Sequence, residues 1–144
     1  MESFNFWTPL AGVVALLFAY YLAHRINKVD PGDEKMQEIS SAIQEGAMAF
    51  LKREYKAMLI FVVLVAIFIF VTGNLDAADS LPAETAIAYV IGCLCSVLAG
   101  YIGMTTATKA NVRTANAAKE STNKALDVAF SGGAAMGMAV VGLG

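Results

Sequence analysis

The feature that most constrains this chain is a long apolar run without charge. Residues 85–108 contain no charged side chain, and about 20 apolar residues are enough for a helix to cross the hydrocarbon of a bilayer. The whole chain of 144 residues is 58% hydrophobic and only 15% charged, whereas a soluble domain usually carries about 25% charged residues. The sequence therefore predicts an all-α, polytopic helical membrane protein.

Three further apolar runs bring the expected number of transmembrane spans to about four, at residues 6–23, 57–72, 86–108 and 125–144. All Lys and Arg residues fall in two windows between these spans, within residues 25–56 and 109–124, and the segment 73–84 has acidic residues but no basic one. Basic residues concentrate on the cytoplasmic side of a membrane. We therefore expect cytoplasmic segments at 24–56 and 109–124, an N-terminus outside, and placement in the cell membrane as a multi-pass protein.

Local patterns set the expected helix ends. Residues 29–33 read Val-Asp-Pro-Gly-Asp, a turn cluster whose last residue, Asp33, can cap a following helix. Met36, Ile39 and Ile43 then recur at helical spacing. The sequence predicts one continuous helix over residues 33–72, with its first half in the cytoplasm. The third helix is expected to continue past its span to about residue 118.

Small residues at steps of four predict close helix packing, because Gly, Ala and Ser let two helix backbones approach in a membrane. One ridge lies in the third span, and two lie in the fourth. These helix-packing candidates are Gly92, Ser96 and Gly100, then Ala129, Gly133 and Gly137, and then Ser131, Ala135 and Ala139. Two such faces on the fourth span indicate a helix with several neighbours.

Motifs that carry catalysis are absent from the sequence. There is no glycine-rich phosphate loop, HExxH, CxxC or Ser/His/Asp set, so no catalytic or metal-binding residue and no nucleic-acid partner are predicted. Asp127 is the one carboxylate within a span, and Lys124 precedes it by three positions. We interpret Asp127 as a first-turn acid paired with Lys124, with a role in substrate or ion access as the alternative. Cys93 and Cys95 are interpreted as plain buried thiols.

Three ordered stretches together resemble the N-terminal part of the membrane-bound, ion-translocating inorganic pyrophosphatases. They are GDEKMQEISSAIQEGAMAFLKREYK at 32–56, GMTTATKANVRTANAA at 103–118 and ALDVAFSGGAAMGM at 125–138. Proteins of this family are homodimers with about sixteen spans in each subunit. The resemblance implies that the chain is the first part of such a bundle, and we expect it to be a fragment of a longer protein.

The same resemblance implies a function. Family members hydrolyse pyrophosphate, as its magnesium complex, on the cytoplasmic side and export protons or sodium, and potassium is a further cofactor to consider. The family's catalytic and magnesium-binding motifs are not present in these residues. The segment is therefore expected to be a scaffold in the lipid bilayer and inactive alone. The sequence does not choose between proton and sodium.

Lys109 and Arg113 lie four positions apart and share one face of a helix just past the third span. One interpretation is an anchor that sets orientation. The other is a basic rim around a cytoplasmic pyrophosphate funnel, which would raise the association rate of a polyanion.

Two rival functions also fit parts of this sequence. A non-catalytic, four-span assembly or scaffold subunit would also lack catalytic motifs. A small four-span exporter would fit the length, but it would need an ionisable side chain deep in the membrane, and the first three spans have none apart from tyrosines and cysteines.

Overall fold

A computed structural model describes residues 2–73 and 84–144, with side chains from Trp7 onward. The described residues form four helices: α1 at Glu2–Asn27, α2 at Glu34–Gly73, α3 at Glu84–Ala118 and α4 at Thr122–Leu143. All four are long and apolar enough to cross a membrane. The all-α, polytopic prediction is confirmed. The acidic residues Asp76 and Asp79 lie outside the described part.

The helix ends predicted for α2 and for the C-terminal end of α3 agree with the observed ones to within one residue. The long helix expected over residues 33–72 is α2, shifted by one residue at each end, and the third helix ends at Ala118 as expected. The fourth helix begins at Thr122, earlier than the predicted residue 125, because the side chain of Ser121 accepts a hydrogen bond from the Lys124 backbone N–H and caps it.

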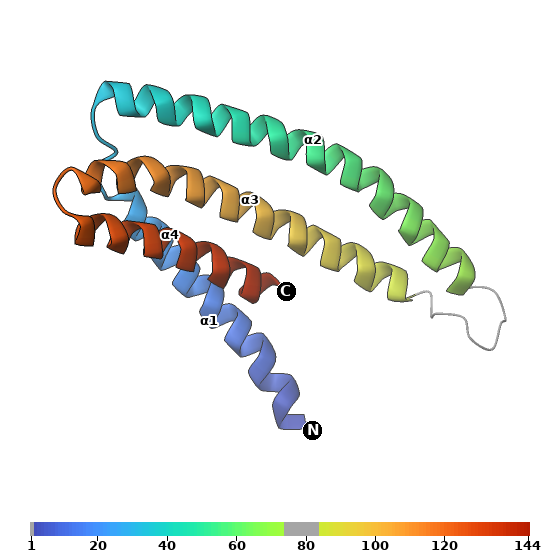
Figure 1. The fold of residues 1–144 in the computed structure, drawn as a ribbon. Helices are drawn as coiled ribbons and strands as arrows, with labels where there is room; N and C mark the ends of the chain where they lie inside the picture. Colours follow the sequence, from blue (N-terminus) through green and yellow to red (C-terminus); the bar gives the residue numbers. More distant parts are fainter. Residues whose placement is uncertain (1, 74–83) are drawn as a thin grey trace.

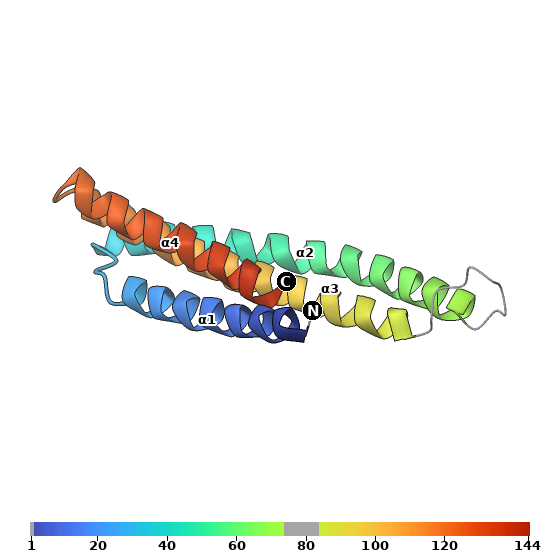
Figure 2. The ribbon, with the colours of Figure 1, turned by 90° about the horizontal axis from the view of Figure 1, so that it is seen from below.

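The helix α3 lies at the centre of the bundle. It packs against α4, α2 and, over a shorter stretch, α1, and α1 packs mainly on α4. Figures 1 and 2 show that the α1–α2 and α3–α4 connections lie at the same end of the molecule. We call this the connection end. Basic residues flank both connections at this end: Arg25, Lys28 and Lys35 lie around the first, and Lys119 and Lys124 lie around the second.

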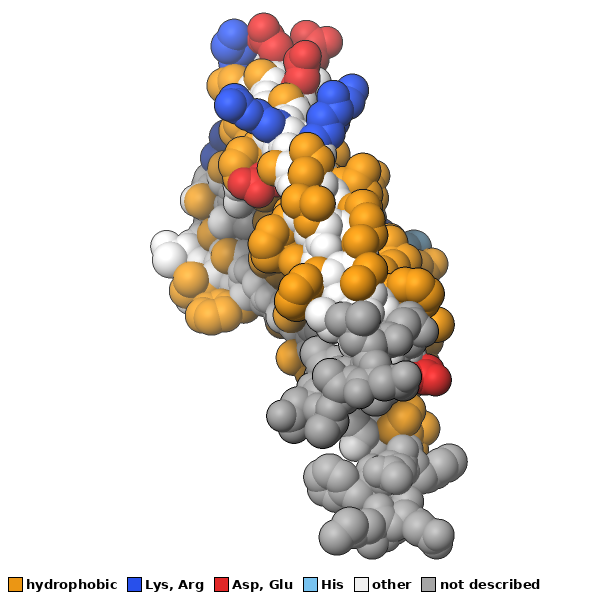
Figure 3. Space-filling model, turned by 90° about the vertical axis from the view of Figure 1, so that its right-hand side faces the viewer, with side chains coloured by type: hydrophobic (Ala, Val, Ile, Leu, Met, Phe, Trp, Pro, Cys, Tyr) orange, Lys and Arg blue, Asp and Glu red, His pale blue; other side chains and the backbone are white. Residues whose placement is uncertain are grey.

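The buried core is thin and consists mainly of small side chains. Ile26 is the one large side chain that is almost fully buried among the described residues, and most of the others are alanines such as Ala15, Ala135 and Ala139. Large apolar side chains are instead exposed, and Figure 3 shows them as a band below a charged end. A soluble monomer rarely exposes so much apolar surface, so this band fits a lipid environment or further helices.

Candidate functional site

A network of polar contacts joins the α1–α2 connection to α3 at the connection end. The Arg113 guanidinium donates through Nε to the Val29 carbonyl at 3.0 Å and through Nη1 to the Lys109 carbonyl at 2.9 Å. The Asn116 amide donates to the Asp30 carbonyl at 3.3 Å. These bonds attach the connection, which follows α1, to a helix more than 80 positions away in the sequence.

The start of α2 is held by the same helix. Asp33 caps α2 as predicted, because its Oδ1 accepts from the Met36 N–H at 2.9 Å, and its Oδ2 lies 2.9 Å from the Lys119 ammonium. The hydrogen bond from Lys119 and that from the Met36 backbone lower the pKa of Asp33 below its ordinary value of 3.8. The carboxylate therefore stays charged further into the acid range than that of an ordinary Asp.

Gly32 makes the tight turn before α2 possible. Its φ is +89°, a conformation that side chains rarely adopt. A Cβ at this position would lie 2.6 Å from the Met36 sulfur and 3.0 Å from the Asn116 Oδ1. The turn can thus lie directly on α3 only with glycine here.

The structure contradicts both parts of the interpretation of Asp127, because α4 begins at Thr122 and Asp127 lies beyond its first turn, and because Lys124 is not its partner. Its Oδ2 lies 2.6 Å from Nη2 of Arg25 at the end of α1, while Lys124 pairs with Glu120, four positions earlier. The competing carboxylate at Glu120 draws Lys124 away, and the packing of α1 on α4 brings Arg25 to Asp127. Asp127 is therefore an inter-helix partner. Both members of this pair have side chains that are about half exposed, at 50% and 58%.

The two basic-rim candidates have different surroundings. Arg113 is half-buried and holds the two carbonyls described above. Lys109 is exposed, and its ammonium makes no hydrogen bond or ion pair within the described residues. The rim hypothesis stays a prediction, and Lys109 tests it most cleanly, because Arg113 also holds the α1–α2 connection on α3.

Close helix contacts form at glycines of α1, α3 and α4. A Cβ at Gly132 would lie 2.8 Å from the Ala110 Cβ, and a Cβ at Gly103 would lie 2.9 Å from Met136. At the α1–α4 crossing, a Cβ at Gly142 would lie 2.8 Å from the Gly12 carbonyl. These glycines let α4 approach α3 and α1 at backbone distance.

The residues of the predicted ridges are buried in some cases and exposed in others. Ser131, Ala135 and Ala139 are buried. A Cβ at Gly92, Gly133 or Gly137 would meet no atom of the described residues within 4 Å, and Ser96 and Ala129 are exposed. Their close packing stays a prediction, and it would involve helices other than the four described. Gly100 lies beside α2, where a Cβ would lie 3.3 Å from the Tyr55 hydroxyl.

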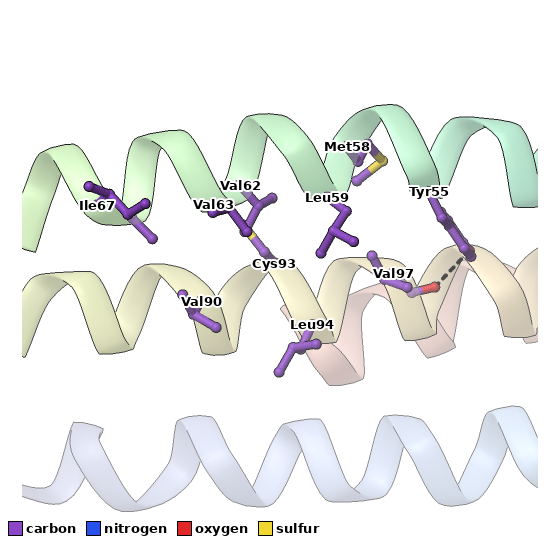
Figure 4. Close-up of a pocket in the computed structure, with 11 residues that line it drawn as sticks. Tyr55, Met58, Leu59, Val62, Val63, Ile67, Val90, Cys93, Leu94 and Val97 are labelled. Atoms are coloured by element: carbon purple, nitrogen blue, oxygen red, sulfur yellow. Dashed lines mark hydrogen bonds between the residues drawn. The ribbon is translucent and has the colours of Figure 1, made fainter.

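The contact between α2 and α3 depends on Tyr55. Its hydroxyl donates to the Val97 carbonyl at 2.9 Å, and Figure 4 shows the side chain reaching from α2 to α3. Farther along the pair, a hollow of about 460 Å³ separates the helices, lined by apolar residues from both and by the free thiol of Cys93. Cys93 and Cys95 are partly buried, unpaired thiols.

The described residues contain no group of three or more His, Cys, Asp or Glu side chains that could hold a metal ion. The connection end has several carboxylates, but the two best defined, Asp33 and Asp127, are each paired with a basic side chain. These ion pairs join helices to one another.

Comparison with known proteins decides the family. A family model described as "Inorganic H+ pyrophosphatase" matches residues 13–144. The chain belongs to this family. The resemblance found in the sequence is thereby confirmed.

Relatives of this chain are named as pumps for two different ions. A "Putative K(+)-stimulated pyrophosphate-energized sodium pump" of Clostridium tetani is 51% identical over 138 residues, covering 96% of this chain and 19% of the relative. A "K(+)-insensitive pyrophosphate-energized proton pump" of Methanosarcina mazei is 42% identical over 143 residues, covering 99% and 20%. A "K(+)-insensitive pyrophosphate-energized proton pump 2" of Moorella thermoacetica is 44% identical over 135 residues, covering 94% and 19%. The chain thus spans about a fifth of the length of these relatives.

Proposed function

We propose that these 144 residues are a membrane scaffold of a pump that couples cytoplasmic pyrophosphate hydrolysis to the export of protons or sodium. The family match over residues 13–144 carries this proposal. Support comes from relatives named as pyrophosphate-energized pumps, and from four helices long enough to span a membrane.

Measurement of phosphate release tests whether the complete protein hydrolyses pyrophosphate while this segment alone does not. The complete protein, in membranes of an expression host, should hydrolyse magnesium pyrophosphate faster than membranes without it. The isolated 144-residue chain should release no phosphate above a protein-free control. Hydrolysis by the isolated chain would show that it contains a catalytic site, and no hydrolysis by the complete protein would favour a non-catalytic scaffold subunit.

The proposed orientation places the connection end in the cytoplasm of the cell membrane and the N-terminus outside. Its support is the concentration of Lys and Arg around the two connections. Single cysteines at Glu84 and Glu120, in a cysteine-free background, can be labelled with an impermeant maleimide in intact cells. Residue 84 should react and residue 120 should not, and the reverse pattern would overturn the orientation.

We further propose that the complete protein takes pyrophosphate as its magnesium complex and works as a homodimer. Family resemblance is the support for both statements. The magnesium ligands would lie outside this segment. The relatives' names include both K(+)-stimulated and K(+)-insensitive pumps.

The rim hypothesis can be tested best at Lys109. Lys109→Gln in the complete pump should raise the KM for magnesium pyrophosphate at low ionic strength and leave kcat nearly unchanged, because steering by exposed charges is screened by salt. Lys35→Gln is a control, since Lys35 is exposed and pairs with Glu38 at 3.0 Å. A KM that is unchanged at low salt would leave Lys109 as an orientation anchor.

A further inference from the structure

A continuous apolar groove runs along the α2–α3 pair. It consists of three adjoining hollows of about 410, 460 and 410 Å³. The outer hollow, farthest from the connection end, and the middle hollow share lining residues such as Ala66 and Val90. The middle hollow and the inner one, nearest the connection end, share Tyr55 and Leu59. Figure 4 shows the middle section, with side chains from both helices bordering it.

The groove has a charged end and an apolar body. Lys52 and Lys56 line the hollow nearest the connection end, together with Tyr55 and Tyr101, and no acidic side chain lines it. The two lysines lie one helical turn apart on the same face. Both are exposed, and their ammonium groups make no ion pair or hydrogen bond within the described residues. They are thus available to an anionic group at this end.

The dimensions of the groove fit one leaflet of a bilayer. From Lys56 to Ile67 the helix α2 rises by about 16 Å, which is about half of the roughly 30 Å hydrocarbon thickness. Tyrosines are favoured at the level of the headgroups, and two of them lie beside the lysines. An acyl chain that starts at Lys56 would therefore reach the middle of the membrane within the groove.

The lining is less suited to another helix. Helices in a membrane approach each other across small residues, but this groove is lined mainly by Leu, Ile, Val and Met. Small residues with open space beside them include Gly133 and Gly137 on α4 and Gly92 on α3, and none of the three lines this groove. The chain thus has a separate surface suited to further helices.

We propose that the α2–α3 groove binds an anionic phospholipid, with its phosphate on Lys52 and Lys56 and one acyl chain between the helices. The positive pair supplies the preference for an anionic headgroup, and the apolar lining holds the chain. This inference depends on the geometry of the groove and not on the pump activity.

Native mass spectrometry of the delipidated protein, titrated with phosphatidylglycerol or phosphatidylcholine, tests the proposal. The first phosphatidylglycerol should bind more tightly than phosphatidylcholine. Lys52→Gln with Lys56→Gln should weaken its binding by about fivefold for each lysine. Arg53→Gln is the matched control, because Arg53 neighbours Lys52 but does not line the groove, and it should change the affinity little.

A second variant tests the apolar part separately. Val63→Trp places a large side chain in the middle hollow and should weaken the binding of both lipids while both lysines remain. The proposal is overturned if the double lysine variant binds phosphatidylglycerol as the wild type does, or if Arg53→Gln weakens it equally. It is also overturned if Val63→Trp disrupts assembly of the complete protein without changing lipid affinity, since another helix would then occupy the groove.

Discussion

Replacing Gly132 with alanine should force α3 and α4 apart. A Cβ at residue 132 would lie 2.8 Å from the Ala110 Cβ, whereas carbon atoms in good contact lie about 3.5–4.0 Å apart. The shortfall is about 1 Å. Ala110 has no side-chain rotamer that could relieve it, so the helix backbones themselves must shift.

The adjacent residue, Gly133, provides a control that cancels the change in helix propensity. Gly133 has nothing within 4 Å of the place where a Cβ would lie, and Gly→Ala in a helix gains about 1 kcal/mol of helix propensity at either site. Overpacking costs about 1–3 kcal/mol. The free energy of unfolding of Gly132→Ala should therefore be about 1–3 kcal/mol below that of Gly133→Ala, even if it lies close to that of the wild type.

The free energies can be measured on the 144-residue chain by SDS titration in mixed micelles. Energy transfer between fluorophores at the ends of α3 and α4 would follow the separation of these helices. The difference between the two alanine variants is the decisive quantity. Equal unfolding free energies would refute the close contact between Gly132 and Ala110.

Three other variants test the contacts that join the helices. Tyr55→Phe should lower the unfolding free energy by about 0.6–2 kcal/mol, the range for one inter-helix hydrogen bond in a membrane, and an unchanged value in SDS titration would count against that bond. Asp33→Asn retains a capping side chain but loses the ion pair with Lys119. Because the folded-state pKa of Asp33 is lowered, the wild type should lose this contribution only below about pH 4, so a variant whose deficit persists unchanged into acid would contradict the assignment. A double-mutant cycle on Arg25→Gln and Asp127→Asn should give a coupling of at most about 1 kcal/mol, since both side chains are half exposed; a larger value would mean that the pair is more shielded than it is here.

The helices could be predicted from sequence because their signals are local. The turn before α2 contains Asp33, which caps the helix, and the apolar spacing after it continues without a break to the end of the span. Such patterns depend on neighbours within a few residues. They located the ends of α2 and the end of α3 to within one residue.

The partners of each helix face could not be predicted in the same way. The spacing of small residues marks two faces on α4, but it does not say which one meets α3. The buried face contains Gly132 and Ala135, while Gly133 and Gly137 stay open. Gly12 and Gly142 belong to no predicted ridge, and their contact joins opposite ends of the sequence.

The ion pair of Asp127 shows the same limit for charges. Helical spacing favours Lys124 as its partner, but Glu120 offers Lys124 an alternative on its other side. Arg25 lies 102 positions away and meets Asp127 only because α1 packs on α4. A local pattern suggests a possible pair, and the tertiary packing selects the actual one.

The most direct test of the proposed function is ion transport by the complete protein. Inverted membrane vesicles that contain it should acidify, or accumulate radioactive sodium, when pyrophosphate is added in the presence of magnesium. Omission of magnesium should abolish the signal, and vesicles without the protein should show none. Vesicles that contain correctly inserted, complete protein but show neither acidification nor sodium uptake on addition of magnesium pyrophosphate would contradict the account.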